Sequence, residues 1–262
     1  MILNNENYYS NEANMEYMSV SQYKQFRKCE AMALADIKGE WKQPKSTALL
    51  VGSYVDSWFE GTLDGFRAEN PEIFKKDGTL KADYIQAEEI IRILKEDEVF
   101  MEYMSGEKQR IFTRKLFGVP WKIKIDSLLP DKIVDLKVMR SMERIMGKSF
   151  VEHWGYDLQM AIYAAVYGKD VETYLAVATK QTPMDRDIIH VPLWRREELL
   201  GEVERFLPHI VAVKSGEIEP ERCGVCEYCR ATKKIVEPID FELVGLSTAE
   251  RKALFGGLGY AK

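Results

Sequence analysis

The spacing of hydrophobic and polar residues changes along the chain, and each spacing predicts a kind of element. From 82 to 104 apolar residues recur every three or four positions, as on one face of a helix, whereas from 107 to 129 the period falls to two, as in strands. The segment 107–129 is therefore predicted as two strands joined near 118–120, and 62–80 as a loop. We predict helices over 19–37, 46–61, 82–104, 148–168 and 196–216, and further strands over 132–138, 171–180 and 187–194.

This order of elements predicts an α/β (α+β) fold, in which helices flank a mixed central β-sheet. The chain has 262 residues, of which 46% are hydrophobic, so it can bury a substantial core. We expect one domain over 1–262, with a flexible N-terminal tail over 1–18 and a cysteine-containing C-terminal extension over 222–262. No apolar run is long enough to span a bilayer and the N-terminus lacks a signal-peptide pattern, so we expect a cytoplasmic protein without membrane contacts.

Charge restricts how the chain could bind nucleic acid. The net charge is -5, so any such binding must come from a local basic patch. One stretch, 108–125, contains six basic residues and no acidic one, and it also contains aromatic residues. Such a strip can follow a phosphate backbone, although a solvated hairpin face is the alternative. The six candidate DNA-binding residues are Lys108, Arg110, Arg114, Lys115, Lys122 and Lys124.

The stretch KIKIDSLLPDKIVDLKV, residues 122–138, places charged residues among apolar ones in two predicted strands. A four-residue loop over 129–132 would pair residue 128 with 133, and thereby set Asp126 opposite Asp135 on one face. Two carboxylates so close repel each other unless a cation or a proton lies between them. Mg²⁺ is commonly held by such a pair, and Lys137 lies on the same face as Asp135. The alternative is an exposed hairpin face with Lys–Asp pairs.

Four segments in this order resemble the PD-(D/E)XK nuclease superfamily, in particular its RecB-like and RecE-like exonucleases and the phage or prophage exodeoxyribonuclease VIII-like proteins. GVPWKIKID followed by IVDLK resembles the central motif of the superfamily. GSYVDSWFEG and YDLQMAIYAAVYG resemble the helices that precede and follow that motif. SVSQYKQFRKCE resembles the N-terminal segment of the iron–sulfur members. Together the segments extend over roughly residues 19–230.

The resemblance implies roles for individual residues of the central motif. Asp126 and Asp135 correspond to the two metal-binding acids, and the backbone carbonyl of Leu136 to a further ligand. Lys137 corresponds to the catalytic lysine, which can orient or deprotonate water or neutralise developing charge. The implied metal is Mg²⁺ or Mn²⁺.

The two flanking helices add further candidates by the same resemblance. Glu60 corresponds to the acid that ends the early helix, and Asp56 stands where the family has a metal-binding histidine. An aspartate also binds hard cations, so Asp56 is expected to join the metal site. Gln159 and Tyr163 correspond to a Q-x-x-x-Y pair that would contact the DNA backbone or support the site. The alternatives are a solvated acidic helix edge and a helix packed on the sheet.

The implied function is a Mg-dependent exodeoxyribonuclease that hydrolyses phosphodiester bonds at duplex DNA ends, in phage-type recombination or repair. DNA would be its substrate, a single-strand-annealing recombinase its natural partner, and a homo-oligomer a possible state. The alternative is a non-catalytic nucleic-acid-binding or recombination-accessory protein that retains the nuclease fold. A third alternative is a structural metal-cluster protein without nuclease chemistry.

Four cysteines require a separate explanation. Cys223, Cys226 and Cys229 form a C-x2-C-x2-C pattern, and Cys29 lies 194 positions before the first of them. Some relatives by resemblance use one early and three late cysteines to hold an iron–sulfur cluster, although their last spacing is longer. The same thiols could hold a 4Fe-4S cluster or Zn²⁺, or could remain free.

Overall fold

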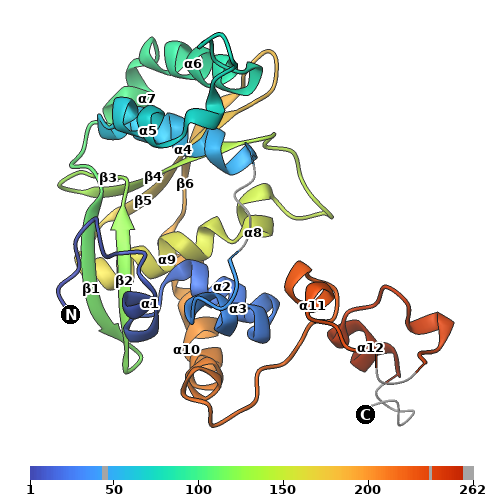
Figure 1. The fold of residues 1–262 in the computed structure, drawn as a ribbon. Helices are drawn as coiled ribbons and strands as arrows, with labels where there is room; N and C mark the ends of the chain where they lie inside the picture. The colour runs from blue at the N-terminus through green and yellow to red at the C-terminus, as the bar shows by residue number, and fades with distance from the viewer. Residues whose placement is uncertain (43–46, 236–237, 256–262) are drawn as a thin grey trace. The chain divides into compact units, whose positions relative to one another are not determined.

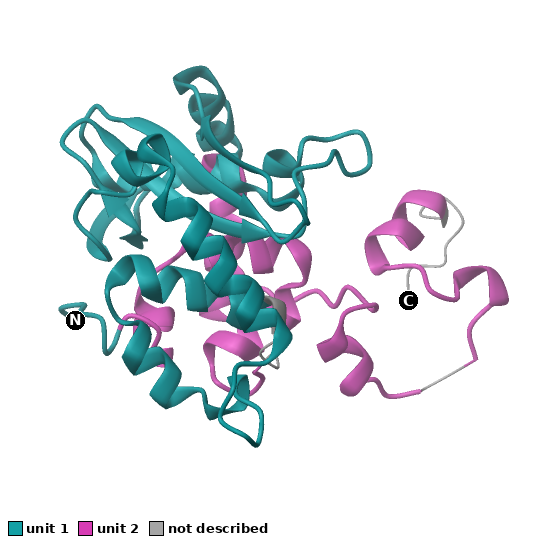
Figure 2. Ribbon diagram, turned by 90° about the horizontal axis from the view of Figure 1, so that it is seen from above, with its two compact units in different colours: residues 1–7, 44–202 teal, residues 8–43, 203–262 magenta. Residues whose placement is uncertain are grey.

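The computed structural model describes residues 1–42, 47–235 and 238–255, and the chain divides into two compact units. Unit 1 comprises residues 1–7 and 44–202, and unit 2 comprises residues 8–43 and 203–262 (Figure 2). Among the described residues, no helix is both long enough and apolar enough to span a membrane. The predicted boundaries of domain, tail and extension stay predictions.

Unit 1 contains a mixed four-stranded sheet and a separate two-stranded hairpin. The sheet has the order β3-β4-β5-β6, in which β4 and β5 are parallel and the outer pairs are antiparallel. The predicted mixed α/β fold is therefore confirmed. The strands are β1 (Arg110–Leu116), β2 (Val119–Ile125), β3 (Ser127–Leu128), β4 (Lys132–Met139), β5 (Glu172–Thr179) and β6 (Arg186–His190).

The register between β3 and β4 is the one that the loop length predicted. Leu128 pairs with Ile133 and Ser127 with Val134. Extending this antiparallel register by one residue sets residue 126 opposite residue 135. The register therefore follows from the four-residue connection, because a connection of fixed length leaves the flanking strands few ways to pair.

Helices cover both faces of the four-stranded sheet (Figure 1). On one face, Val134 and Leu136 of β4 pack in an apolar cluster with Val51 of α4 and Ile90 of α6. On the other face, strand β5 packs against Met160 of α9 and its neighbours. The helices of unit 1 are α4 (Thr47–Glu60), α5 (Leu63–Glu69), the 3₁₀ turn η1 (Pro71–Ile73), α6 (Ala82–Lys95), α7 (Glu98–Tyr103), α8 (Phe150–Trp154) and α9 (Tyr156–Tyr167); α10 (Leu193–Ser215) begins in unit 1 and continues into unit 2.

Three predicted helices are broken by local backbone geometry. Gly155 adopts φ 62°, a left-handed conformation that glycine reaches without steric cost, and it ends α8 and precedes α9. Asp97 accepts a hydrogen bond from the Phe100 N–H and thereby caps α7, which separates α7 from α6. Cys29 has an extended backbone between α2 and α3. The predicted loop over 62–80 contains α5 and η1, so that prediction was wrong for these residues.

Unit 2 has its own buried side chains, including Tyr23 and Phe26 of α2 and Leu207 and Ile210 of α10. Lys214 of α10 donates hydrogen bonds to backbone carbonyls of the N-terminal segment, of which the Asn14 carbonyl is 2.8 Å away. The further elements of unit 2 are α1 (Asn11–Glu16), α2 (Val20–Lys28), α3 (Glu30–Ile37), α11 (Glu227–Ala231), the 3₁₀ turn η2 (Phe241–Leu243) and α12 (Thr248–Phe255).

Candidate functional site

Asp126 and Asp135 lie on adjacent segments of the chain in unit 1, since Asp126 contacts the backbone beside Asp135. Asp126 follows the end of β2, and its Oδ2 accepts a hydrogen bond from the backbone N–H of Leu136 at 3.0 Å. Its Oδ1 accepts from Nε2 of Gln109 at 3.3 Å. Asp135, in β4, is 2% exposed. The chain thus holds one carboxylate against the backbone of the strand that carries the other.

Two side chains contact the buried carboxylate of Asp135. Gln159 of α9 donates from Nε2 to Asp135 Oδ1 at 2.6 Å, and Lys137 forms an ion pair with Oδ2. Oδ2 is also one of the buried polar atoms that accept no well-aligned hydrogen bond in the described part of the chain. A buried carboxylate oxygen without such a donor is suited to a positively charged partner, whether Lys137 or a metal ion.

The helix α9 presents an aromatic residue that the sequence analysis did not single out. Nζ of Lys137 lies 5.0 Å from the ring centroid of Tyr156, within the range of a cation–π contact. Tyr156 and Gln159 are three residues apart in α9, so both can face β4. Tyr163, the other predicted residue of this helix, is half-buried and packs in the apolar cluster around Met160. The three-residue spacing between Tyr156 and Gln159 was the feature of the sequence from which this position of Tyr156 could have been predicted.

The early helix α4 contributes Asp56 and Glu60 to the same charged group. Burial raises the pKa of Asp56 to about 7, and the charges of Asp135 and Glu60 act in the same direction. Lys137 and Lys124 oppose this increase. Burial also raises the pKa of Glu60, and Lys124 opposes it. Asp56, at the position of the family's histidine, therefore lies within electrostatic reach of the predicted site.

The pKa values of Asp126 and Lys137 are shifted by the same group of charges. Burial, Asp135 and Asp56 raise the pKa of Asp126 well above its ordinary value, against the opposing effects of Lys137 and the Leu136 N–H. Burial alone would lower the pKa of Lys137, but the charges of Asp135 and Asp126 outweigh burial and raise it. The carboxyl groups of Asp56 and Asp126 therefore keep their protons to a higher pH than an ordinary aspartate does, whereas Lys137 stays protonated at neutral pH.

The donor set fits a hard divalent cation in chemistry, since Asp56, Asp126 and Asp135 all offer carboxylate oxygens. The side chains are not gathered around a common point, however. Among the described residues, the four cysteines are the one group of three or more His, Cys, Asp or Glu side chains whose ligand atoms lie close enough together to hold a metal ion as they stand. Binding at the acidic group would require Asp135 to exchange its ion pair with Lys137 for the metal.

The six residues of the predicted basic strip do not form one solvated face. Lys122 is 1% exposed, and its burial lowers its pKa to about 8. Lys108 is half-buried and donates to the carbonyl of Met104, and Lys124 is also half-buried. The three exposed members are Arg110, Arg114 and Lys115. Of these, Arg110 forms an ion pair with Glu107. These three remain accessible to a phosphate backbone as they stand.

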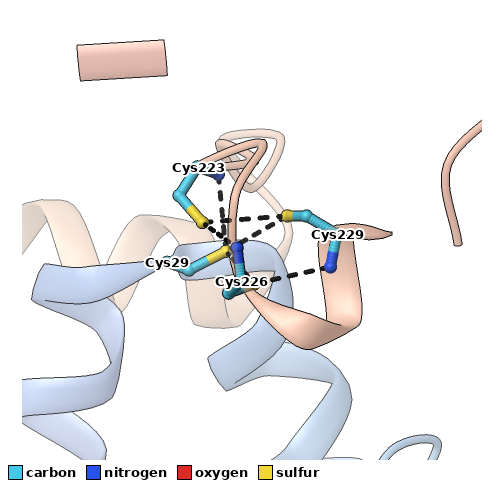
Figure 3. A group of neighbouring side chains, drawn as sticks. All are labelled: Cys29, Cys223, Cys226 and Cys229. Carbon is cyan, nitrogen blue, oxygen red and sulfur yellow. Dashed lines mark hydrogen bonds between the residues drawn. The ribbon is translucent and has the colours of Figure 1, made fainter. Parts of the chain in front are cut away.

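The four cysteines converge in unit 2, although one of them lies almost 200 positions from the others (Figure 3). The Sγ of Cys29 is 3.6 Å from that of Cys229 and 3.7 Å from that of Cys226. The Sγ atoms of Cys223 and Cys229 are 3.9 Å apart. All four sulfurs lie within 4.8 Å of one another. Cys29 reaches this group because it stands at the extended break between α2 and α3.

Backbone N–H groups point at these sulfurs. The N–H of Cys226 donates to Cys223 Sγ at 3.3 Å, and that of Cys229 to Cys226 Sγ at 3.4 Å. Burial raises the pKa of Cys223, but hydrogen bonds from the N–H groups of Val225 and Cys226 outweigh it and lower the pKa to about 7. Burial raises the pKa of Cys29 to about 12. A cation at the centre would be needed for Cys29 to be a thiolate at neutral pH.

Comparison with known proteins identifies the family. Residues 19–232 match the family described as "PDDEXK-like domain of unknown function (DUF3799)". The match extends over most of the chain and includes the acidic group of unit 1 and the four cysteines of unit 2. This protein therefore belongs to that PDDEXK-like family, and the resemblance seen in the sequence is confirmed at that level.

A solved structure supports the assignment. The "Putative exonuclease" from Eubacterium rectale is 49% identical, and the match covers 94% of this chain and 99% of that chain with a TM-score of 0.90. A second structure, SSO0001, is 16% identical over 79% of this chain and 90% of that one, with a TM-score of 0.30, and supports no conclusion. None of the curated proteins matches the chain.

Proposed function

We propose that this protein is a metal-dependent DNA exonuclease that hydrolyses phosphodiester bonds at duplex DNA ends. The observation that carries the proposal is the charged group of unit 1, in which the buried Asp135 pairs with Lys137 and the charges of Asp126 and Asp56 lie within electrostatic reach of that pair. Its family and the similarity to a protein described as an exonuclease support a nuclease activity. The ion would be Mg²⁺ or Mn²⁺, because the available ligands are carboxylate oxygens.

Each residue has a role that follows from its contacts. When bound, a divalent ion would polarise the phosphodiester and lower the pKa of a water. Asp126 and Asp135 would hold it through oxygen, with Asp56 and the Leu136 carbonyl as further donors. Gln159 fixes the orientation of Asp135 through its 2.6 Å hydrogen bond. Lys137 stays protonated, so we assign it the stabilisation of developing negative charge rather than the removal of a proton.

Digestion of end-labelled linear duplex DNA, with closed circular DNA as a matched substrate, tests the proposal. We expect Mg²⁺-dependent release of label from linear DNA, inhibition by EDTA and no cleavage of the circles. Asp135→Asn should abolish release, because it removes a metal-binding charge while keeping the acceptor for Gln159. Ile85→Ala, an exposed apolar residue of α6, is the control. Wild-type protein that binds linear DNA without cleaving it would support the non-catalytic alternative instead.

We propose further that the four cysteines hold a single tetrahedral metal ion, with Zn²⁺ the first candidate. A Zn–S bond of about 2.3 Å places the sulfurs of a tetrahedral site about 3.8 Å apart. Three of the sulfur–sulfur separations in the structure are 3.6, 3.7 and 3.9 Å, and all lie within 4.8 Å. A 4Fe-4S cluster places an iron under each thiolate, which requires wider separation of the sulfurs. The spacing thus favours zinc over the cluster that the resemblance implies.

The biological setting of the activity is a separate matter. A place in phage-type recombination or repair, beside a single-strand-annealing recombinase, stays a prediction from the resemblance. The expected homo-oligomer and cytoplasmic location stay predictions too.

A further inference from the structure

The connection between β4 and α8, here called the 140–149 loop, contains a tight turn at its tip. Ile145 and Lys148 exchange backbone hydrogen bonds of 2.9 and 3.0 Å across two intervening residues. Both of these, Met146 with φ 50° and Gly147 with φ 80°, have left-handed backbones. Two positive φ values in a two-residue connection are the signature of a type I′ turn. The tip therefore has a defined conformation.

The residue at the tip is unusual for its place. Met146 is 92% exposed although its side chain is apolar. Its left-handed backbone also carries a steric cost that glycine, asparagine or aspartate would largely avoid. Neither property contributes to the stability of the folded chain. An apolar side chain held outward on a fixed turn is suited to insertion into another molecule, because little freedom is lost on contact.

The base of the loop is anchored in the apolar core of unit 1. Met142 packs against the cluster that contains the buried Phe150, and these two residues stand on the two sides of the tip. Ser149 and Glu152 form a capping box that fixes the start of α8. Arg144 donates to the Gly147 carbonyl at 2.6 Å across the turn. The loop thus joins a rigid tip to a rigid base.

The position and charge of the loop both point to DNA. Figure 1 shows the loop leaving β4 and projecting beyond the sheet before the chain returns at α8. It connects β4, which carries Lys137, with α8, and α8 is followed by α9, which carries Gln159. Arg140 follows Lys137 by three residues, which is about 10 Å along an extended chain. The exposed charged residues of the loop are Arg140, Glu143, Arg144 and Lys148, three basic and one acidic.

We propose that the 140–149 loop is a strand-separating wedge, in which Met146 inserts at the terminal base pair of a duplex and the basic residues contact the phosphates. Apolar side chains act in this way in proteins that unstack base steps. In this proposal a separated strand would follow β4 to the acidic group, since the loop begins where β4 ends. This inference rests on the proposed exonuclease function and adds to it how a paired end is opened.

The variant Met146→Asn isolates the apolar side chain from the turn. It creates Asn-Gly, the sequence that a type I′ turn prefers, so the fold should be retained or slightly stabilised. We expect Met146→Asn to slow digestion of blunt duplex DNA about tenfold, as loss of help in unstacking one base step would. Digestion of a duplex with a splayed, unpaired end should stay within about twofold of wild type, because there the wedge has nothing to separate.

A direct reading of end opening accompanies the kinetics. In a Lys137→Met background, binding should raise the fluorescence of 2-aminopurine placed in the terminal pair, and Met146→Asn should remove that rise. Ile85→Asn also replaces an apolar side chain by asparagine, at a residue of α6 that is 54% exposed. It is the matched control and should keep the rise in fluorescence.

Equal digestion of both substrates by Met146→Asn and wild type, with unchanged fluorescence, would overturn the wedge. Equal slowing of digestion on both substrates would overturn the wedge too, and would mean that Met146 only contacts DNA without separating its strands. Failure of the wild type to digest either substrate would instead overturn the proposed function.

Discussion

Asp135 is a buried anion whose stability depends on two neighbours. Gln159 donates to one of its oxygens, and Lys137 pairs with the other. A carboxylate that loses its charged partner in such a place retains its desolvation cost without compensation. The geometry therefore couples folding to the catalytic arrangement, since the same lysine serves both.

We expect Lys137→Met to lower the free energy of unfolding of the metal-free protein by about 3 kcal/mol, since it leaves the Asp135 charge buried and unpaired. The double variant Asp135→Asn, Lys137→Met should regain part of that loss, because it removes both charges. Urea denaturation in EDTA measures both, and neither variant should cleave DNA. A double variant as unstable as the single one would show that the ion pair is not the source of the loss.

Asp56 gives a pH dependence whose sign follows from its raised pKa. An unfolded aspartate titrates near pKa ~3.9, whereas the folded chain raises the pKa of Asp56 to about 7. Between these values the folded state holds a proton that the unfolded state has released. The stabilisation is therefore fully present below pH ~4 and is lost as pH rises through about 7. The raised pKa of Asp126 acts in the same direction.

We therefore expect the melting temperature of the metal-free protein to fall between about pH 5 and pH 8, and Asp56→Asn to make that fall shallower. Added Mn²⁺ should restore stability most at the high end of the range, where protons compete least with the metal. Thermal unfolding in EDTA, then in Mn²⁺, measures both effects. Parallel curves for the wild type and the variant would place Asp56 on a solvated helix face.

At the scale of elements, α9 is fixed near its N-terminus by an ion pair. Asp157, in the first turn of α9, is buried, and Arg195 of α10 lies 2.8 and 2.9 Å from its Oδ2. Removing the carboxylate takes away the buried partner of the half-buried guanidinium, which then keeps the exposed Glu198 at 2.7 Å, and it removes a favourable charge from the helix start. Because α9 also carries Gln159, its position should affect the orientation of Asp135.

We expect Asp157→Ala to destabilise the protein by about 2 kcal/mol and to lower the rate of cleavage without abolishing it. The control is Glu198→Ala, which removes an exposed partner of the same arginine and should cost under about 1 kcal/mol. Denaturation and digestion rates measured on both variants test this. Equal effects of the two substitutions would mean that Asp157 does not fix α9.

The elements also show what a sequence alone can predict here. The period of two located the hairpin and β4, and the four-residue connection gave the register that sets residue 126 opposite 135. The break at Cys29 could not be predicted, because no glycine or proline marks it. The short helix α5 was missed because Gly65 within it and Pro71 after it are typical of a loop. Lys122 was expected on a solvated face, but its burial depends on tertiary packing that periodicity does not reveal.

At the scale of the whole molecule, a net charge of -5 opposes approach to DNA. Attraction must come from local groups, and the candidates in unit 1 include the exposed Arg110, Arg114 and Lys115 of β1 and the basic residues of the 140–149 loop. Wherever the carboxyl groups of unit 1 are ionised they add to the repulsion, and a divalent ion would offset that charge. Metal binding would therefore serve DNA affinity as well as cleavage.

The cysteines connect segments that are far apart in the chain. Cys29 and Cys223 are 194 positions apart in the sequence, yet both lie in unit 2 with their sulfurs in one group. A bound ion would therefore join the break between α2 and α3 to the segment that leads into α11. Metal binding of this kind contributes directly to folding, because the unfolded chain has no preformed site.

We expect purified protein to contain one zinc per chain and Cys226→Ser to lose it and to melt at a lower temperature. The expected loss is several kcal/mol, since structural zinc contributes folding energy outright. Val225→Ala, a neighbouring exposed residue, is the control and should keep both the metal and the melting temperature. Elemental analysis for zinc, iron and sulfide distinguishes the candidates. Iron with equimolar sulfide in anaerobically purified protein would establish a cluster in place of the single ion. Metal-free protein whose melting is unchanged by Cys226→Ser would show that the thiols are free.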